Sequence, residues 1–92
     1  MTLEELYQII LDRKENMRTD SYVANLFKQG KDRIIQKVGE EATEVVIAAK
    51  NEQKERIIAE VADLQFHLLV LLASCDITVD EIFEELQKRN KK

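Results

Sequence analysis

The sequence contains no proline and no tryptophan, and it has only two glycines and one cysteine among 92 residues. Residues that break helices are thus scarce, and 35% of the chain is charged, which is typical of an all-α protein rich in good helix formers. The single cysteine, Cys75, excludes an internal disulfide and leaves no second thiol for a metal site. We expect a protein of a reducing compartment in which Cys75 is a small buried hydrophobe.

An excess of positive charge is also missing, because the formal net charge is −4 and basic residues are scattered. This pattern argues against a nucleic-acid partner. The first ten residues, MTLEELYQII, lack the basic start and apolar stretch of a secretory signal. The longest apolar tract, Leu64 to Ala73, is interrupted by Gln65 and His67 and is shorter than the ~20 residues of a membrane span. We therefore expect a cytoplasmic protein with no membrane partner.

The length predicts a single domain over residues 1–92, folded as a compact bundle of about four to five helices. We expect helices over residues 2–15 and 22–29, a third helix that follows Asp32 and reaches Ala49 before the polar break KNEQK, and two more over residues 56–74 and 79–90. The capping residues predicted for them are Thr2 with Glu5, Asp20 or Ser21, Asp32, and Thr78 with Glu81, and Gly30 should stop the second helix.

One broad face of the third helix is expected to pack in the core; it carries Ile34, Ile35, Val38, Ala42, Val45, Val46 and Ala49. Ala48 belongs to the neighbouring face. The fourth helix is apolar on nearly every side after Leu64, so its own neighbours or a second subunit should bury it. A chain this short buries only about 60–70% of its unfolded surface, which makes oligomerisation a reasonable expectation.

Carboxylates concentrate on these two helices. Glu41 and Glu44 share a face of the third helix, with Glu40 to one side, and Glu60 and Asp63 lie in line on the fourth. The short polar turn between the helices predicts an antiparallel hairpin. Four facing carboxylates would repel one another when empty, and a hard cation such as Mg²⁺, which prefers oxygen ligands, would relieve the repulsion.

Less specific explanations exist for each residue. An E-x-x-E pair is common on a solvated helix, Lys37 can simply pair with Glu41, and His67 is most often a hydrogen-bonded core histidine. Tyr22 and Phe27 fit core packing better than base stacking. The position of the acids at the edge of the core, rather than in pairs with lysine or arginine four residues away, favours a functional site.

Three segments, SYVANLFKQG, QKVGEEATEVVIAAKN and EVADLQFHLLVLL, closely resemble the phosphoribosyl-ATP pyrophosphohydrolase family of histidine biosynthesis, within the all-α MazG-like superfamily. The superfamily pattern, E-x-x-E followed by E-x-x-D, corresponds to Glu41, Glu44, Glu60 and Asp63. Asn25 stands where a lysine is expected, which puts one phosphate contact in doubt. Gln65 and Phe66 replace a more usual Leu-Tyr, which removes a hydroxyl.

The resemblance implies hydrolysis of the α–β phosphoanhydride of phosphoribosyl-ATP to phosphoribosyl-AMP and pyrophosphate. It also implies Mg²⁺ dependence, with Mn²⁺ as a substitute, a helical homodimer, and phosphoribosyl-AMP cyclohydrolase as a functional neighbour. Our hypothesis is that Glu41, Glu44, Glu60 and Asp63 hold Mg²⁺ and that a carboxylate, first of all Glu40, positions the water. The residues expected to contact the substrate are Lys37, at a phosphate, and Ser21, Tyr22 and Lys28.

Two rival functions remain open at this point. Within the same class, the chain could be a house-cleaning pyrophosphohydrolase that acts on other nucleoside triphosphates. From another class, it could be a non-catalytic helical dimerisation module whose acids are plain surface. Stoichiometric Mg²⁺ binding and the choice among triphosphates separate these functions.

Overall fold

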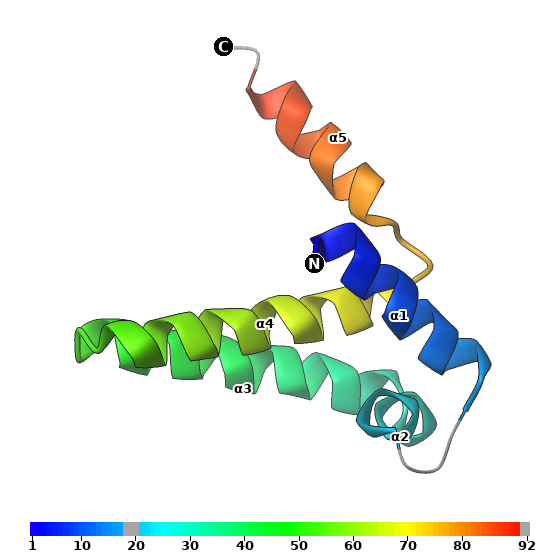
Figure 1. Cartoon of the computed structure of the whole chain (residues 1–92), viewed down its shortest axis with the longest axis horizontal. Coiled ribbons are helices and arrows are strands. Elements are labelled where there is room, and N and C mark those ends of the chain that lie inside the picture. Colours follow the sequence, from blue (N-terminus) through cyan, green and yellow to red (C-terminus); the bar gives the residue numbers. More distant parts are fainter. Residues whose placement is uncertain (18–20, 91–92) are drawn as a thin grey trace.

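The computed structural model describes residues 1–17 and 21–90, and within these ranges it contains five α-helices and no strand. This confirms the all-α prediction (Figure 1). The helices are α1 (Leu3–Glu15), α2 (Tyr22–Gln29), α3 (Lys31–Lys50), α4 (Lys54–Ser74) and α5 (Val79–Arg89).

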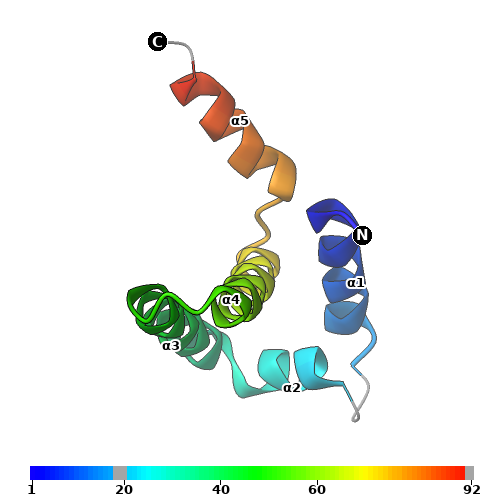
Figure 2. The ribbon, with the colours of Figure 1, turned by 60° about the vertical axis from the view of Figure 1, so that its left-hand side comes forward.

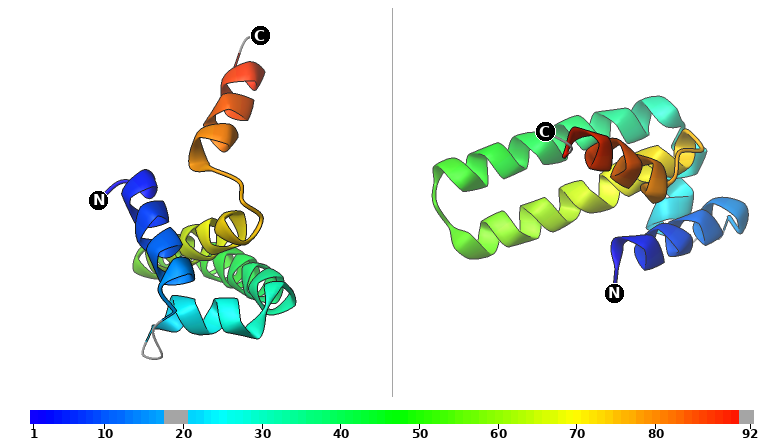
Figure 3. Two further views of the ribbon diagram at one scale, coloured as in Figure 1. Left: turned by 90° about the vertical axis from the view of Figure 1, so that its right-hand side faces the viewer. Right: turned by 90° about the horizontal axis from the view of Figure 1, so that it is seen from above.

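The two long helices, α3 and α4, form an antiparallel hairpin that is the frame of the molecule (Figure 1). At the end of the hairpin away from its turn, α2 lies across α3 and α1 packs against α4 (Figure 2). Helix α5 leaves this body and projects away from it, as Figures 1 and 2 and the left panel of Figure 3 show. The core therefore sits at one end of the hairpin.

Four large side chains are almost completely buried in that core: Ile10, Leu26, Ile34 and Val70, one from each of the first four helices. Phe27 packs against this cluster, as predicted. Tyr7 is buried at the side of the core toward α5, where its hydroxyl donates a 2.6 Å hydrogen bond to the carbonyl of Ile77. The core thus ties α1 to the segment before α5 and holds α2 against the hairpin.

Helix starts follow the local signals closely. The capping boxes predicted at Thr2 and Thr78 are both formed, each with a glutamate three residues on. Ser21 caps α2, since its hydroxyl accepts a 3.2 Å hydrogen bond from the backbone N–H of Ala24. The alternative cap, Asp20, lies outside the described residues.

The start predicted for the third helix is wrong. Asp32 is not its cap: α3 already begins at Lys31, and Gly30 is at once the last cap of α2 and the first of α3. Gly30 has φ 102° and ψ 170°, a conformation that residues other than glycine rarely adopt, so the chain turns a corner in one residue. Helix α4 likewise starts at Lys54, two residues before the predicted Arg56.

The face of α3 that meets α4 differs from the predicted one. Ile34 and Ala48 are buried, whereas Ile35 and Val46 are 51% and 60% exposed. At 100° per residue, the buried stripe is rotated by about 60° toward the acidic side of the helix. The prediction of Ile35 and Val46 as core residues of a single chain is therefore wrong, and Glu41 lies at the seam between the two helices.

One further expectation is wrong. Cys75 is exposed at the end of α4, so it is not a buried hydrophobe. Helix α4 as a whole, Lys54–Ser74, is long and apolar enough to cross a membrane when length and composition alone are considered. That test also selects core helices of soluble proteins, and α4 packs against α1 and α3 and carries Glu60 and Asp63 in its length.

Candidate metal centre and substrate pocket

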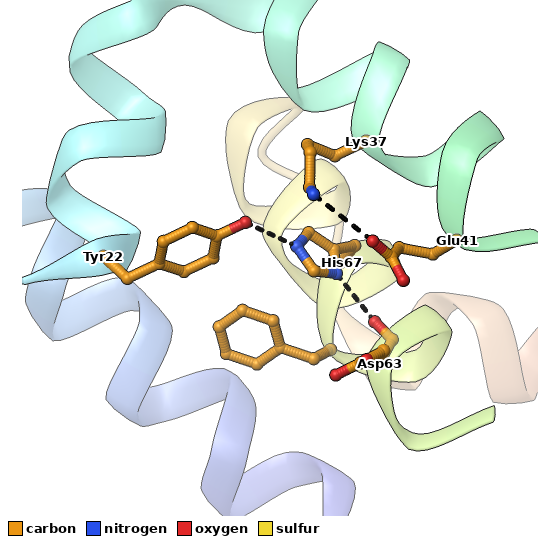
Figure 4. A pocket seen from close by; sticks show the side chains of 6 residues that line it. Tyr22, Lys37, Glu41, Asp63 and His67 are labelled. Carbon is orange, nitrogen blue, oxygen red and sulfur yellow. Dashed lines mark hydrogen bonds and ion pairs between the residues drawn. The ribbon is translucent and has the colours of Figure 1, made fainter. Parts of the chain in front are cut away.

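A pocket of about 450 Å³ opens between α2, α3 and α4, and its size is ordinary for a small-molecule site. Figure 4 shows that side chains from all three helices converge on it. The lining residues are Tyr22 from α2, Lys37 and Glu41 from α3, and Asp63, Phe66 and His67 from α4. The hairpin predicted from the polar turn thus brings the two acidic segments face to face.

Three carboxylates meet across the seam. Glu41, Glu60 and Asp63 each offer one oxygen, and these three oxygens lie within 4.8 Å of one another. The donor set consists of oxygen alone, which suits a hard cation such as Mg²⁺ and does not suit zinc. These residues therefore fit the metal that the sequence pattern implies.

The electrostatics of Glu60 reflect this crowding. Desolvation raises the pKa of its carboxyl above the usual 4.5, and the charges of Glu44, Asp63 and Glu41 raise it further, while Arg56 acts in the opposite direction. A carboxyl with a raised pKa favours its protonated form because its neighbours make the negative charge unfavourable. The cluster as it stands is short of positive charge.

Lys37 is a cation in the lining of the pocket. Its Nζ lies 3.3 Å from Glu41 Oε1 and 3.8 Å from Glu40 Oε1, so the pairing of Lys37 with Glu41 four residues on is confirmed. Burial alone would lower the pKa of Lys37, but the hydrogen bond with Glu41 and the charges of Tyr22, Glu41 and Glu40 raise it overall. Lys37 therefore stays charged beside the carboxylates. The premise that these acids lack a partner at that spacing is wrong for Glu41.

The other two predicted acids lie at the margin. Glu44 is close enough to raise the pKa of Glu60, and its Oε2 lies 3.9 Å from Arg56 Nη2, outside the tight group of three. Glu40 points along α3, where it accepts a 3.0 Å hydrogen bond from Gln36 and pairs with Arg33 at 3.7 Å. The structure brings Glu41, Glu60 and Asp63 together and leaves Glu40 outside the pocket lining.

His67 is a buried, hydrogen-bonded histidine and also a wall of the pocket. Its Nδ1 lies 2.8 Å from the backbone carbonyl of Asp63, and its Nε2 lies 2.9 Å from the hydroxyl of Tyr22 (Figure 4). The ring thus connects α2 to the turn of α4 that carries Asp63. Such contacts behind a candidate ligand fix the orientation of its backbone.

An aromatic wall completes the pocket. Tyr22 is 51% exposed, so it is not a core residue, and its ring stacks on Phe66 with centroids 6.2 Å apart. The ring of His67 meets Phe66 edge-on at 5.2 Å. Sequence reasoning assigned no role to Phe66, although its position three residues after Asp63 places it on the same side of α4.

The two remaining predicted contacts lie away from the lining. The Ser21 hydroxyl is used as the cap of α2, and Lys28 is exposed in the last turn of that helix. Both residues belong to α2 or its cap and so move with Tyr22. Within the described residues the pocket is lined without them.

Comparison with known proteins gives a consistent picture. The model of the phosphoribosyl-ATP pyrophosphohydrolase family matches residues 3–90. A phosphoribosyl-ATP pyrophosphatase of Clostridium novyi is 51% identical over 90 residues, which are 98% of this chain and 82% of that protein. One from Saccharolobus solfataricus is 49% identical over 97% of this chain and 95% of its own length.

A third relative has a longer chain. The histidine biosynthesis bifunctional protein HisIE of Caldanaerobacter subterraneus subsp. tengcongensis is 52% identical over 90 residues, which are 98% of this chain and 44% of that protein. The match to the family model spans nearly the whole chain and includes all four acids selected by spacing. The chain therefore belongs to the phosphoribosyl-ATP pyrophosphohydrolase family.

Proposed function

We propose that this pocket hydrolyses phosphoribosyl-ATP to phosphoribosyl-AMP and pyrophosphate, by attack of water on the α–β phosphoanhydride, as a step of histidine biosynthesis. The family that the chain belongs to is named for this activity. The observation that carries the proposal is the group of three carboxylate oxygens within 4.8 Å, beside a charged lysine, in a pocket of nucleotide size.

Glu41, Glu60 and Asp63 would hold Mg²⁺, with Mn²⁺ as a substitute, and Glu44 would join them from the next turn of α3. Bound there, the ion supplies the positive charge that an anionic triphosphate needs as its bridging bond breaks. An acidic protein can thus accept an anionic substrate.

The remaining roles fall to this chain's own groups. Lys37 would contact a phosphate oxygen, since its ammonium is charged and faces the pocket. A carboxylate would orient the attacking water and take its proton, and Glu40 stays our candidate for that role at the edge of the site. Tyr22 would meet the nucleotide directly, with Ser21 and Lys28 on the same helix as further contacts.

We also propose that the chain acts as a homodimer in the cytoplasm. Its apolar side chains are unusually exposed for a single chain, notably Ile35, Val46, Ile58, Phe83 and Leu86, each more than half exposed. In α5, the first turn is acidic and the last turn is basic, so two copies of this helix would attract each other in antiparallel orientation.

The functional neighbour that we propose is phosphoribosyl-AMP cyclohydrolase, the enzyme that would consume the product.

The test is pyrophosphate release from phosphoribosyl-ATP by the purified chain, with and without Mg²⁺, beside ATP and deoxynucleoside triphosphates at equal concentration. We expect turnover of phosphoribosyl-ATP that requires the metal and exceeds that of the ordinary triphosphates. Faster turnover of the ordinary triphosphates would instead favour a house-cleaning enzyme.

Substitution tests the metal ligands. Glu44→Gln and Asp63→Asn should each lower Mg²⁺-dependent turnover by about 100-fold or more, as expected when a ligand of a catalytic metal is altered. Circular dichroism should show unchanged helix content. Glu55→Gln, an exposed acid in the first turn of α4, is the matched control and should retain full activity. Activity that survives in both site variants would rule out the metal assignment.

A further inference from the structure

The direction of each hydrogen bond around His67 follows from its partners. A backbone carbonyl can only accept, so the Nδ1 that lies 2.8 Å from the Asp63 carbonyl must carry a proton and donate it. In the neutral ring, Nε2 then has a lone pair and no proton. The tautomer of His67 is thereby assigned by its contact within α4.

That assignment determines what Tyr22 does. The Tyr22 hydroxyl lies 2.9 Å from Nε2, and because Nε2 can only accept, Tyr22 donates its single proton there. The phenol oxygen keeps its acceptor capacity and has no proton left to offer. Tyr22 therefore presents an acceptor to the pocket that it lines.

An acceptor cannot bind a phosphate oxygen, which is itself an acceptor. The phosphate groups must find donors elsewhere in the pocket, and Lys37 is placed for that. Tyr22 lies across the pocket from Glu41 and Asp63, the side where the phosphates would be held (Figure 4). In a nucleotide, the group next to the α-phosphate is the ribose, and its hydroxyls are donors.

We infer that the Tyr22 oxygen accepts a hydrogen bond from a hydroxyl of the ribose that carries the triphosphate, and so selects a ribonucleotide. The inference rests on the proposed function. Tyr22 is well held for such selection, because its ring stacks on Phe66 at 6.2 Å and meets His67 edge-on at 5.9 Å. A fixed polar group inside a pocket discriminates strongly against an analogue that lacks its partner.

The experiment compares three substrates and two variants at pH 8. The substrates are phosphoribosyl-ATP and its counterparts made from 2′-deoxy-ATP and 3′-deoxy-ATP, and the variants are Tyr22→Phe and Tyr7→Phe. Tyr7 offers the same chemical change outside the pocket, since its hydroxyl bonds to the Ile77 carbonyl. Each KM and kcat is measured, together with the Kd with Ca²⁺ in place of Mg²⁺.

We expect Tyr22→Phe to raise the KM and Kd of the parent substrate by about 5- to 10-fold, as for one lost hydrogen bond. One of the two deoxy substrates should show the same rise with the unmodified enzyme and no further rise with Tyr22→Phe. Tyr7→Phe should leave all ratios between substrates unchanged, even if it melts at a lower temperature.

Equal losses on all three substrates with Tyr22→Phe would overturn the inference, because the residue would then act only by holding His67. No loss at all would also overturn it. The Kd measurement separates this inference from the proposed function. If Tyr22→Phe weakens the binding of the parent substrate but not that of one deoxy substrate, and no pyrophosphate is released, the proposed reaction is contradicted. The contact of Tyr22 with the ribose is then still supported.

Discussion

At the scale of single residues, Glu60 is the carboxylate on which repulsion from the neighbouring acids acts. Its neighbours raise its pKa, so the folded chain binds a proton at Glu60 more tightly than the unfolded chain does. The free energy of unfolding then includes a contribution from Glu60 that is complete below the ordinary value of 4.5 and is lost as the pH rises through the higher folded-state pKa. A bound divalent cation would reverse this loss.

Glu60→Gln should therefore raise the melting temperature of the metal-free protein at pH 7, because the substitution removes a charge that its neighbours repel. Below pH 4.5 the two proteins should melt alike, since Glu60 is then protonated. The order should invert at pH 7 in excess Mg²⁺, which stabilises the unmodified chain by mass action. Thermal melts followed by circular dichroism, with Glu55→Gln as control, measure this. A metal-free Glu60→Gln that melts lower at pH 7 would contradict the repulsion.

Much of the site could be predicted at this scale because the acids follow a local pattern. The spacing of Glu41, Glu60 and Asp63 on two helices joined by a short turn was enough to bring them together. The part that could not be predicted lies in contacts between distant segments. No local pattern pairs Tyr22 with His67, which lie 45 residues apart.

At the scale of helices, the joint at Gly30 sets how α2 lies on the hairpin. Its φ of 102° with ψ of 170° is almost exclusive to glycine, and no spacer residue separates α2 from α3. The angle of α2, and with it the position of Tyr22 in the pocket, depends on this one residue. Gly39, the other glycine, lies inside α3, where an added methyl group would meet no neighbouring atom within 4 Å.

We predict that alanine at the two glycine positions changes the free energy of unfolding in opposite directions. Gly30→Ala should lower the free energy of unfolding by about 1–3 kcal/mol, because alanine is strained in that conformation. Gly39→Ala should raise it by about 0.5–1 kcal/mol through better helix propensity. Urea unfolding at one protein concentration compares them. Equal effects of the two substitutions would show that the Gly30 backbone does not need glycine.

Helix caps were predictable and helix faces were only partly so, for one physical reason. A capping box is complete within four residues, as at Thr2 and Thr78. Which side of an apolar helix meets its neighbour depends on that neighbour. Periodicity therefore found that α3 is apolar on one side, but it could not tell that α4 would pack nearer Ala48 than Val46.

At the scale of the whole molecule, the chain exposes more surface and is more extended than a compact protein of its mass. A compact protein of 10.7 kDa is expected to expose about 5,500 Å², and this chain exposes 6515 Å². Its radius of gyration is 14.4 Å, against about 12.3 Å expected for 92 residues. The projecting α5, with Ile82, Phe83 and Leu86 uncovered, contributes to both differences. These values support the proposed homodimer.

Phe83→Ser should accordingly shift the protein toward monomer, because it removes from α5 a 53% exposed aromatic side chain that is not part of the buried core cluster. We expect at least a tenfold rise in the dimer dissociation constant, or about 1.4 kcal/mol. Analytical ultracentrifugation over a range of concentrations measures it, with Glu84→Gln on the same helix as control. An unmodified chain that stays monomeric at about 100-fold above assay concentration would refute the dimer.

The order of the pocket walls along the chain has a consequence for how ligands leave. Glu41 and Asp63 belong to one hairpin closed by residues 51–53, whereas Tyr22 reaches the pocket from α2 through contacts remote in sequence. Elements held by fewer long-range contacts open locally at lower free energy than the core does. A local opening at the Tyr22 end of α2 would free the sugar side of a bound nucleotide and leave Glu41 and Asp63 in place on the hairpin. If Mg²⁺ is bound there as we propose, it would stay with the carboxylates while nucleotides exchange.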